Sequence, residues 1–265
     1  MMLVIIVRGL MLPGAMAGVE FLFKFDLDAF TWDAMLQAMG FTFFSLCVGC
    51  GCMLTYGSYL PRETNLINGC TWIAFLGVVS SLLGGLMIMP SVFAFGLDPS
   101  AGPGLTFITM PAVFAQIPFG HLFAVMFYFC IVVAAITSSV SMIEIIMAFL
   151  IDEHRMARPV AAVCSTVVLA VVGALPCLSF GQLADITFFG SKTFFDVFDF
   201  FTSNISLPIG GLVILYLAGW KCWDIVKKDI SHGGALSDNV LRLLQLVMIG
   251  FSPIVVLLVL ISGLI

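Results

Sequence analysis

Hydroxyl-bearing and acidic side chains interrupt an apolar stretch near the middle of the chain, AAITSSVSMIE. On an α-helix, Ala134, Thr137, Ser138 and Ser141 of this stretch share one face. Two hydroxyls and a backbone carbonyl suit a dehydrated Na⁺, because hard cations take oxygen ligands. The same residues also fit a second interpretation, in which Ser and Thr bond back to a carbonyl one turn earlier and allow close helix packing.

Three acidic residues stand inside apolar runs and need an explanation. Glu144 ends the stretch above, and an ionisable group within a membrane span is by default functional. It also fits a structural cap, because Asp152 follows about two turns later. Asp196 and Asp199 stand near the end of another apolar run, where they are either interfacial residues or part of a gate or vestibule.

A second polar interruption lies nearer the start of the chain, in GFTFFSLCVGCGCMLTYGSY. Gly49 and Gly51 each weaken a helix by about 1 kcal/mol relative to Ala. We therefore predict that the helix opens between Cys47 and Gly51, next to Ser45, which leaves backbone carbonyls and amides unpaired at mid-membrane. Such backbone persists only where protein or a watery cavity surrounds it, and transporters build binding sites in this way.

The eight cysteines lie mostly inside apolar runs, where a thiol behaves as a small hydrophobic group. Cys47, Cys50 and Cys52 resemble a metal cluster, but no His lies near them and three thiolates in lipid are costly. Packing or pocket lining is the favoured interpretation, and we expect no metal beyond sodium. No nucleophile–base pair or phosphate-binding loop is present in the sequence, so we expect no enzymatic activity.

The composition defines the broad class. The chain has 265 residues, of which 62% are hydrophobic and 9% charged, whereas soluble domains carry about 25% charged residues. This composition predicts an all-α, multi-pass membrane protein, surrounded by the lipid bilayer. The sequence shows no basic patch or aromatic–basic stripe, which argues against nucleic acid as a partner.

The apolar runs predict a single transmembrane domain, 1–265, with one partial and six complete spans. The partial span covers residues 1–12, and the complete spans cover 34–60, 69–96, 119–150, 159–177, 193–217 and 239–264. Between them we expect a polar loop over 13–33, a hairpin loop over 97–118 and an amphipathic, basic segment over 218–238. The positive-inside rule places three groups on the cytoplasmic side: Arg62; Arg155 and Arg158; and Lys221, Lys227 and Lys228.

Several long, ungapped segments resemble the neurotransmitter:sodium symporter family, in its bacterial sodium-dependent amino-acid transporter branch. They are FFSLCVGCGCMLTYGSYL, GPGLTFITMPAVFAQIPFG, AAITSSVSMIE and FDFFTSNISLPIGGLVILYLAGW. The resemblance covers essentially the whole chain, from the family's late fifth helix to its eleventh. It implies the C-terminal portion of the inverted-repeat (5+5) sodium symporter fold, with a broken helix at 47–51.

The resemblance also implies a function. It is sodium-coupled symport of an amino acid across the plasma membrane by alternating access, with this chain as the C-terminal part of the transporter. The partner would be helices 1–5 of the family fold, or a chain that supplies them. The alternative is a truncated or non-transporting fragment, or an assembly partner, that inserts in the membrane but lacks activity alone.

Site residues are carried over position by position from the same resemblance. The second sodium site would use the carbonyl of Ala134 with the hydroxyls of Thr137 and Ser138, and the first sodium site would use Ser45. The substrate pocket would be lined by Phe44 (an aromatic lid), Ser45, Cys47, Cys50, Ser138 and Met142. Asp199 matches the acidic residue of the outer gate.

Two positions depart from the family pattern. Phe41 stands where chloride-dependent members carry Gln, so chloride coupling lacks support. Leu76 or Gly77 stands where the family's seventh helix usually offers Asn or Asp to the first sodium site. The second sodium site is therefore the better supported of the two.

Overall fold

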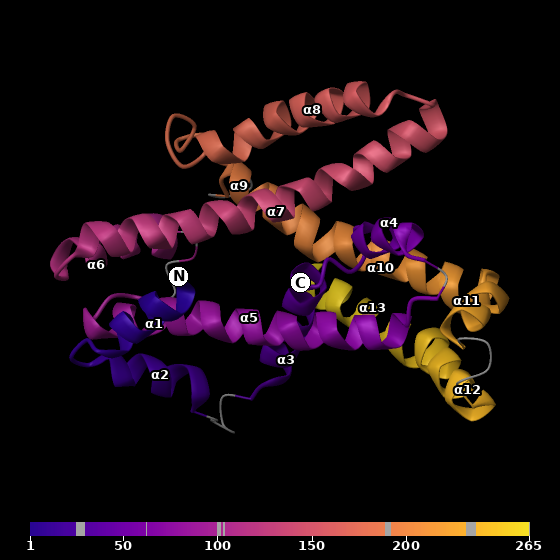
Figure 1. Ribbon diagram of the computed structural model, residues 1–265, viewed down its shortest axis with the longest axis horizontal. Coiled ribbons are helices and arrows are strands. Elements are labelled where there is room, and N and C mark those ends of the chain that lie inside the picture. Colours follow the sequence, from indigo (N-terminus) through magenta and orange to yellow (C-terminus); the bar gives the residue numbers. More distant parts are fainter. Residues whose placement is uncertain are drawn as a thin grey trace. The chain divides into compact units, whose positions relative to one another are not determined.

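The computed structural model describes residues 1–24, 30–61, 63–99, 102, 104–188, 192–231 and 237–264. Arg62, used above for orientation, lies outside these ranges, as do parts of the predicted loops. Within them the chain is helical, apart from turns and one isolated bridge between Phe188 and Lys192 (Figure 1).

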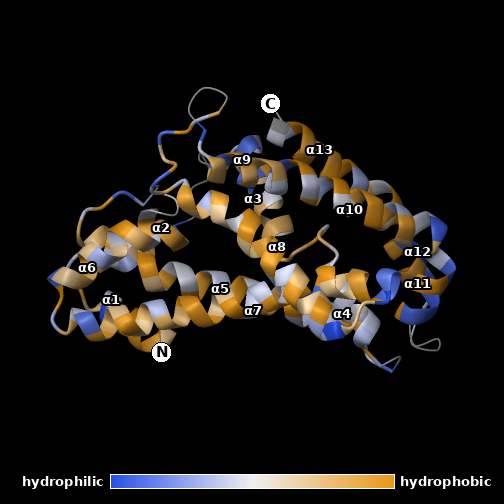
Figure 2. Ribbon diagram, turned by 90° about the horizontal axis from the view of Figure 1, so that it is seen from above, coloured by the Kyte–Doolittle hydropathy of each residue, from blue (hydrophilic) through white to orange (hydrophobic). Residues whose placement is uncertain are grey.

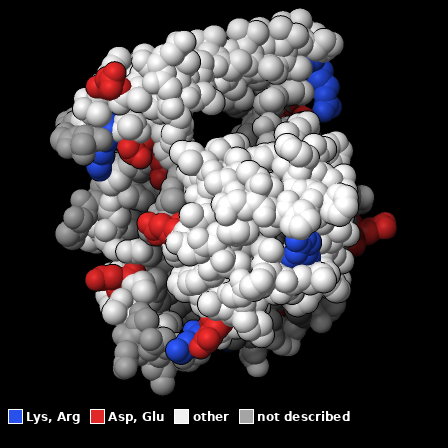
Figure 3. All heavy atoms as spheres, turned by 90° about the vertical axis from the view of Figure 1, so that its left-hand side faces the viewer, with Lys and Arg blue, Asp and Glu red and all other residues white. Residues whose placement is uncertain are grey.

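Five helical segments in the described part are long and apolar enough to cross a bilayer. They are α5 (Leu66–Ala94), α7 (Gly120–His154), α8 (Arg158–Leu178), Phe194–Lys221 and Asp238–Gly263. A helix pairs its own backbone N–H and C=O groups by hydrogen bonds, and this is necessary because lipid chains offer no hydrogen-bond partners. Hydrophobic residues predominate along these segments (Figure 2), and the charged side chains on the face in Figure 3 are scattered over a largely uncharged surface. The prediction of an all-α, multi-pass membrane protein is confirmed.

Two of these segments contain π-helical turns. The segment Phe194–Lys221 consists of α9 (Phe194–Phe200), the π-helix η2 (Phe201–Ser206), α10 (Leu207–Tyr216) and the π-helix η3 (Leu217–Lys221). The last segment consists of α12 (Asp238–Leu246), the π-helix η4 (Val247–Phe251) and α13 (Ser252–Leu264). Such wide turns are rare and often occur at functional sites.

The span predicted over 34–60 is two helices, α3 (Trp32–Ser45) and α4 (Cys52–Tyr59). The predicted break at 47–51 is therefore confirmed. Thr31 fixes the start of α3, because its Oγ1 accepts a hydrogen bond from the Ala34 amide at 3.2 Å.

The first residues differ from the expectation. Helices α1 (Met2–Leu10) and α2 (Ala15–Phe23) form a pair bent by 113°. The polar loop predicted over 13–33 is thus wrong over residues 15–23. The sequence AMAGVEFLF carries a single charge, Glu20, and otherwise has residues that a helix accepts.

Two predicted non-spanning segments contain short helices. The hairpin region 97–118 holds the π-helix η1 (Leu105–Thr109) and α6 (Met110–Gln116). The amphipathic region 218–238 holds α11 (Trp223–Ile230), where polar residues gather in Figure 2. Lys227 of α11 forms an ion pair with Asp238 of α12 at 3.4 Å.

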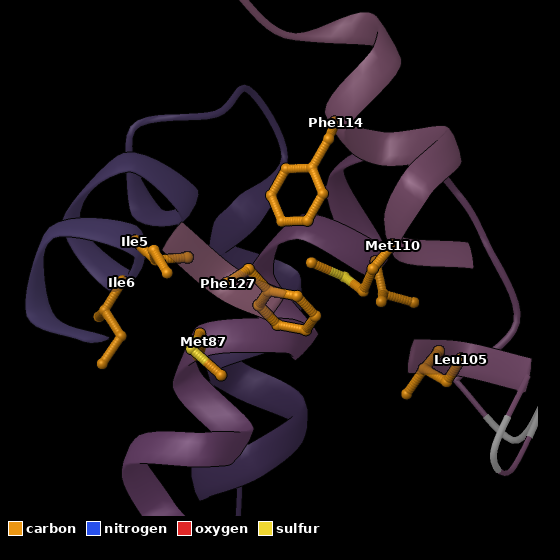
Figure 4. Close-up of a cluster of buried hydrophobic side chains, with 8 residues drawn as sticks. Ile5, Ile6, Met87, Leu105, Met110, Phe114 and Phe127 are labelled. Atoms are coloured by element: carbon orange, nitrogen blue, oxygen red, sulfur yellow. The ribbon is translucent and has the colours of Figure 1, made fainter. Parts of the chain in front are cut away.

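The chain divides into two compact units, which are described separately. The first comprises Met1–Asp28 and Trp72–Ser139, and the second comprises Ala29–Thr71 and Val140–Ile265. Phe127 of α7 lies at the centre of the first unit's core and is fully buried (Figure 4). The other members of this core are Ile5, Ile6, Met87, Val92, Leu105, Met110 and Phe114. The core thus joins α1, α5 and the hairpin region to α7.

One hydrogen bond also ties the hairpin region to α7. The hydroxyl of Tyr128 donates to the carbonyl of Thr106, within η1, at 2.9 Å. The ring of Phe127 lies 5.4 Å from that of Phe114 in α6 and 5.2 Å from that of Tyr128. The hairpin region is therefore held by aromatic packing and by a polar contact.

We predict that Phe127→Ala lowers the free energy of unfolding of the first unit by about 3–5 kcal/mol, because it leaves a cavity in a packed core. The measurement is thermal unfolding of the chain in detergent. Phe129→Ala is the matched control, since Phe129 lies on the same helix but is 56% exposed. It should change stability by no more than about 0.5 kcal/mol. Equal losses in both variants would contradict the packing described here.

Candidate functional site

The break in the α3–α4 span begins at a cysteine. After α3, the Cys47 amide donates to the Phe44 carbonyl at 3.1 Å and the Val48 amide to the Phe43 carbonyl at 2.9 Å. This pair of bonds ends many helices and requires a left-handed residue, usually Gly. Here that residue is Cys47, with φ +51°, and a non-glycine residue pays about 1–2 kcal/mol for this conformation.

The glycines continue the break. Gly49 and Gly51 have φ angles of +92° and +88°, which glycine adopts without steric cost. The carbonyl of Cys47, freed from the helix, accepts a hydrogen bond from the Cys50 thiol at 3.0 Å. No side chain caps the first turn of α4. The break thus places a helix carboxyl end and an uncapped helix amino end a few residues apart.

Phe44 and Asp199 line the same cavity, of about 490 Å³, within the second unit. This volume is within the range of small-molecule sites, about 300–1,000 Å³. Its walls come from α3, from α9 with η2, and from α13: Leu36, Gln37, Gly40, Phe41 and Phe44; Asp199, Ser203 and Asn204; Val259, Ser262 and Gly263. The predicted lid and gate residues are therefore brought together.

Two hydrogen bonds shape this cavity. Ser203 Oγ donates to Asp199 Oδ1 at 3.2 Å, which orients the carboxylate. The Asn204 side-chain amide donates to the Gly263 carbonyl at 3.0 Å and so ties η2 to α13. Sequence reasoning missed Gln37, Ser203 and Asn204 as lining residues. Asn204 could have been predicted, because it is a polar residue inside an apolar span.

The two acids at the start of α9 have different roles. Asp196 forms a capping box, in which its carboxylate accepts from the Thr193 amide and hydroxyl, both at 2.8 Å. The Thr193 hydroxyl accepts from the Asp196 amide in return. Asp196 therefore completes a helix end, whereas Asp199 faces the cavity.

The predicted sodium ligands of α7 lie in the first unit. Thr137 Oγ1 donates to the Ala134 carbonyl at 2.9 Å, which is the local back-bonding that the packing interpretation describes. Ala134, Thr137 and Ser138 are all exposed within the described residues. Met142 follows Ser138 by about one turn on the same helix face, in the second unit together with Ser45. The sodium assignment stays a prediction.

Glu144 has structural partners. Its carboxylate lies 3.1 Å from the Arg158 guanidinium and accepts a hydrogen bond from the Tyr59 hydroxyl at 3.0 Å. Ser141 lies about one turn before Glu144 on α7 and contacts two residues of α4. Its Oγ accepts a hydrogen bond from the Tyr56 hydroxyl at 2.6 Å, and its carbonyl contacts the buried Cys52 thiol. These contacts fasten α4 to α7 and to the start of α8. The structural interpretation of Glu144 fits them.

A spanning helix broken at its middle, set among continuous spans, defines a class of membrane proteins with discontinuous helices, to which many secondary transporters belong. The profile of the Sodium:neurotransmitter symporter family matches residues 1–265. The chain belongs to this family, which consists of transporters and not of enzymes.

Bacterial relatives are similar over most of the chain. It is 42% identical over 212 residues to the "Uncharacterized sodium-dependent transporter YhdH" of Bacillus subtilis, which covers 80% of this chain and 47% of the relative. It is 34% identical over 227 residues to an "Uncharacterized sodium-dependent transporter" of Haemophilus influenzae, which covers 85% of this chain and 50% of the relative. The chain thus spans about half the length of the curated relatives it matches.

The fold also matches a solved structure. The crystal structure of MhsT in complex with L-phenylalanine superimposes on 99% of this chain and 59% of the MhsT chain, with a TM-score of 0.87 and 33% sequence identity. The predicted sodium symporter fold with a broken helix is confirmed by this match.

We predict that Glu144→Gln loosens α4. The substitution keeps the side-chain shape but removes the charge that pairs with Arg158 and strengthens the bond from Tyr59. Amide hydrogen exchange in α4 should become several-fold faster, because exchange reports local opening. Glu153→Gln, an exposed acid on the same helix, is the control and should leave α4 unchanged. Unaltered exchange in Glu144→Gln would show that other contacts hold α4.

Proposed function

We propose that this chain forms part of a sodium-coupled amino-acid symporter that works by alternating access. The observation that carries the proposal is the break between Ser45 and Cys52, which separates the carboxyl end of α3 from the uncapped amino end of α4 by a few residues. Membership of the family supports this function. Helices 1–5 of the family fold, in this polypeptide or in another, would complete the transporter.

The ends of the broken helix suit a zwitterion. The carboxyl end of a helix carries a partial negative charge and the amino end a partial positive charge. The α-ammonium group of an amino acid would bind near the end of α3, beside Ser45 and Cys47. Its α-carboxylate would bind near the uncapped start of α4. Cys50 and Met142 are small or flexible, which leaves space for a bulky apolar or aromatic side chain.

The outer gate would use the cavity residues. Phe44 is the second-last residue of α3, directly before the break, so its ring could cover a substrate bound there. Asp199, from α9, lines the same cavity, and its carboxylate is oriented by Ser203. A cation from outside the described walls would pair with Asp199 when the gate closes.

Binding of L-phenylalanine tests this function. A chimaera that joins the N-terminal part of MhsT to this chain should bind radiolabelled L-phenylalanine only when sodium is present, with MhsT itself as the positive control. This chain alone, in the same assay, addresses the non-transporting alternative. A chimaera that folds in detergent but binds none of the neutral L-amino acids would contradict the proposal and favour that alternative.

The sodium ligands lead to a sharper prediction in this chimaera. Thr137→Ala/Ser138→Ala removes two hydroxyl oxygens with little change in volume. Leaving a buried polar group without a partner costs about 1–3 kcal/mol. Losing the oxygens that coordinate the ion should cost at least as much, which corresponds to about 5- to 150-fold in sodium affinity. The sodium concentration for half-maximal binding of L-phenylalanine should rise by that factor. Because coupling is reciprocal, affinity for L-phenylalanine at limiting sodium should fall as well.

Thr71→Ala is the matched control. Thr71 lies on α5 and makes the same kind of local bond as Thr137, from its hydroxyl to the Ile67 carbonyl at 2.8 Å. Its removal should leave the sodium dependence unchanged. If the double variant behaves like Thr71→Ala, the hydroxyls of α7 serve helix packing alone.

A further inference from the structure

The break touches α10 through bare backbone, within the second unit. A Cβ atom built on Gly210 would overlap the carbonyl oxygen of Gly49 and lie 2.9 Å from its carbonyl carbon. A Cβ atom built on Gly49 would overlap the Leu207 carbonyl oxygen and lie 2.9 Å from the Gly211 amide nitrogen. Real Cβ atoms essentially never approach other atoms so closely, so only glycine fits at either position.

The two glycines are required for different reasons. Gly49 has a positive φ, which by itself favours glycine. Gly210 lies inside α10, where Ala would form a better helix. The helical conformation of α10 therefore does not require glycine at position 210. The close approach of the Gly49 backbone does require it.

The other contacts of the break are mostly local. Two backbone bonds end α3, the Cys50 thiol donates to the Cys47 carbonyl, and the Gly51 carbonyl accepts from Thr55 in α4. The next residue, Gly211, packs against the ring of Phe43, at 3.3 Å from a built Cβ atom to Cε1. Phe43 supplies the carbonyl that receives the Val48 amide. Helix α10 thus contacts the break and the last turn before it.

We propose that Gly210 is a positioning residue for the substrate pocket. By admitting the backbone of Gly49, it holds the break against α10 and so fixes Cys47 and Cys50. Asp199 lies about three turns earlier in the same continuous helical segment, Phe194–Lys221. The gate acid and the pocket residues of the break therefore move as one body. The functional meaning of this contact rests on the proposed function, whereas the contact itself does not.

The native thiols report on the contact in the full chain. N-ethylmaleimide labelling of the detergent-purified protein, followed over time by peptide mass spectrometry, gives a rate for each cysteine. Cys47 and Cys50 lie in the break and are half-buried, whereas Cys164 and Cys177 on α8 are exposed and serve as internal references. Gly210→Ala should raise the labelling of Cys47 and Cys50 about tenfold relative to the references, which corresponds to about 1.4 kcal/mol of local opening.

Gly250→Ala is the matched control, because Gly250 is also helical but a Cβ atom there meets nothing within 4 Å. It should leave all rates unchanged. A uniform loss of stability would raise every rate together, so the ratio separates positioning from a general packing role. An unchanged ratio in Gly210→Ala, or an equal change in Gly250→Ala, would overturn the proposal.

A milder variant keeps the test decisive if Gly210→Ala does not fold. Gly211→Ala meets the flexible ring of Phe43 instead of backbone, so a smaller rise at Cys47 and Cys50 is expected, and no rise would overturn the proposal. Labelling requires neither sodium nor substrate. The contact can therefore be refuted while the chimaera still binds L-phenylalanine, and it can be supported even if the chimaera does not.

Discussion

Every backbone amide and carbonyl inside a bilayer must find a partner within the protein, and the structure follows from how this requirement is met. Continuous helices meet it by themselves. The interruption between α3 and α4 does not meet it in this way. There the Cys50 thiol donates a hydrogen bond to the Cys47 carbonyl, and the backbone of Gly49 lies directly against α10. In a secondary transporter, an interruption of this kind supplies backbone groups to a substrate or an ion. Under the function proposed here, the cost in helix formation is what makes a site possible.

The position of this break could be predicted from sequence, but its backbone conformation and its contact with α10 could not. Gly49 and Gly51 indicated the region because glycine weakens helices. The predicted range, Cys47–Gly51, includes the residue at which the chain leaves the helix, Cys47, which adopts a left-handed conformation that is rare outside glycine. Local propensity predicts neither this conformation nor the close approach of Gly49 to Gly210 of α10. That contact joins residues far apart in the sequence, and only the fold brings them together.

The polar residues within spans show a similar division. Sequence alone identified Glu144, Asp196 and Asp199 as needing an explanation, because burial in lipid is costly. It left a structural and a functional interpretation open for each. The structure gives each a different environment: Arg158 and Tyr59 beside Glu144, a capping box for Asp196, and a cavity wall for Asp199, whose role in a gate stays a proposal. The polar loop over 13–33 failed for a simpler reason, since only one of its charges, Glu20, lies within helix α2 and the others follow that helix in the sequence.

Helix α3 and two of the long segments, Phe194–Lys221 and Asp238–Gly263, meet in the second unit at small residues. Gly40 faces Val259, Gly211 faces Phe43 and Val256, and Gly263 faces Asn204. In lipid, helices gain little from hydrophobic association, so close packing and hydrogen bonds hold them together. Close approach of α3, α10 and α13 positions the walls of the cavity that Phe44 and Asp199 line. Closely packed helices have discrete rather than continuous arrangements, so a change at this cavity would shift whole helices. If Asp199 acts in the gate as we propose, its place on the segment that carries Gly210 would couple the gate to the break, and alternating access would need such coupling.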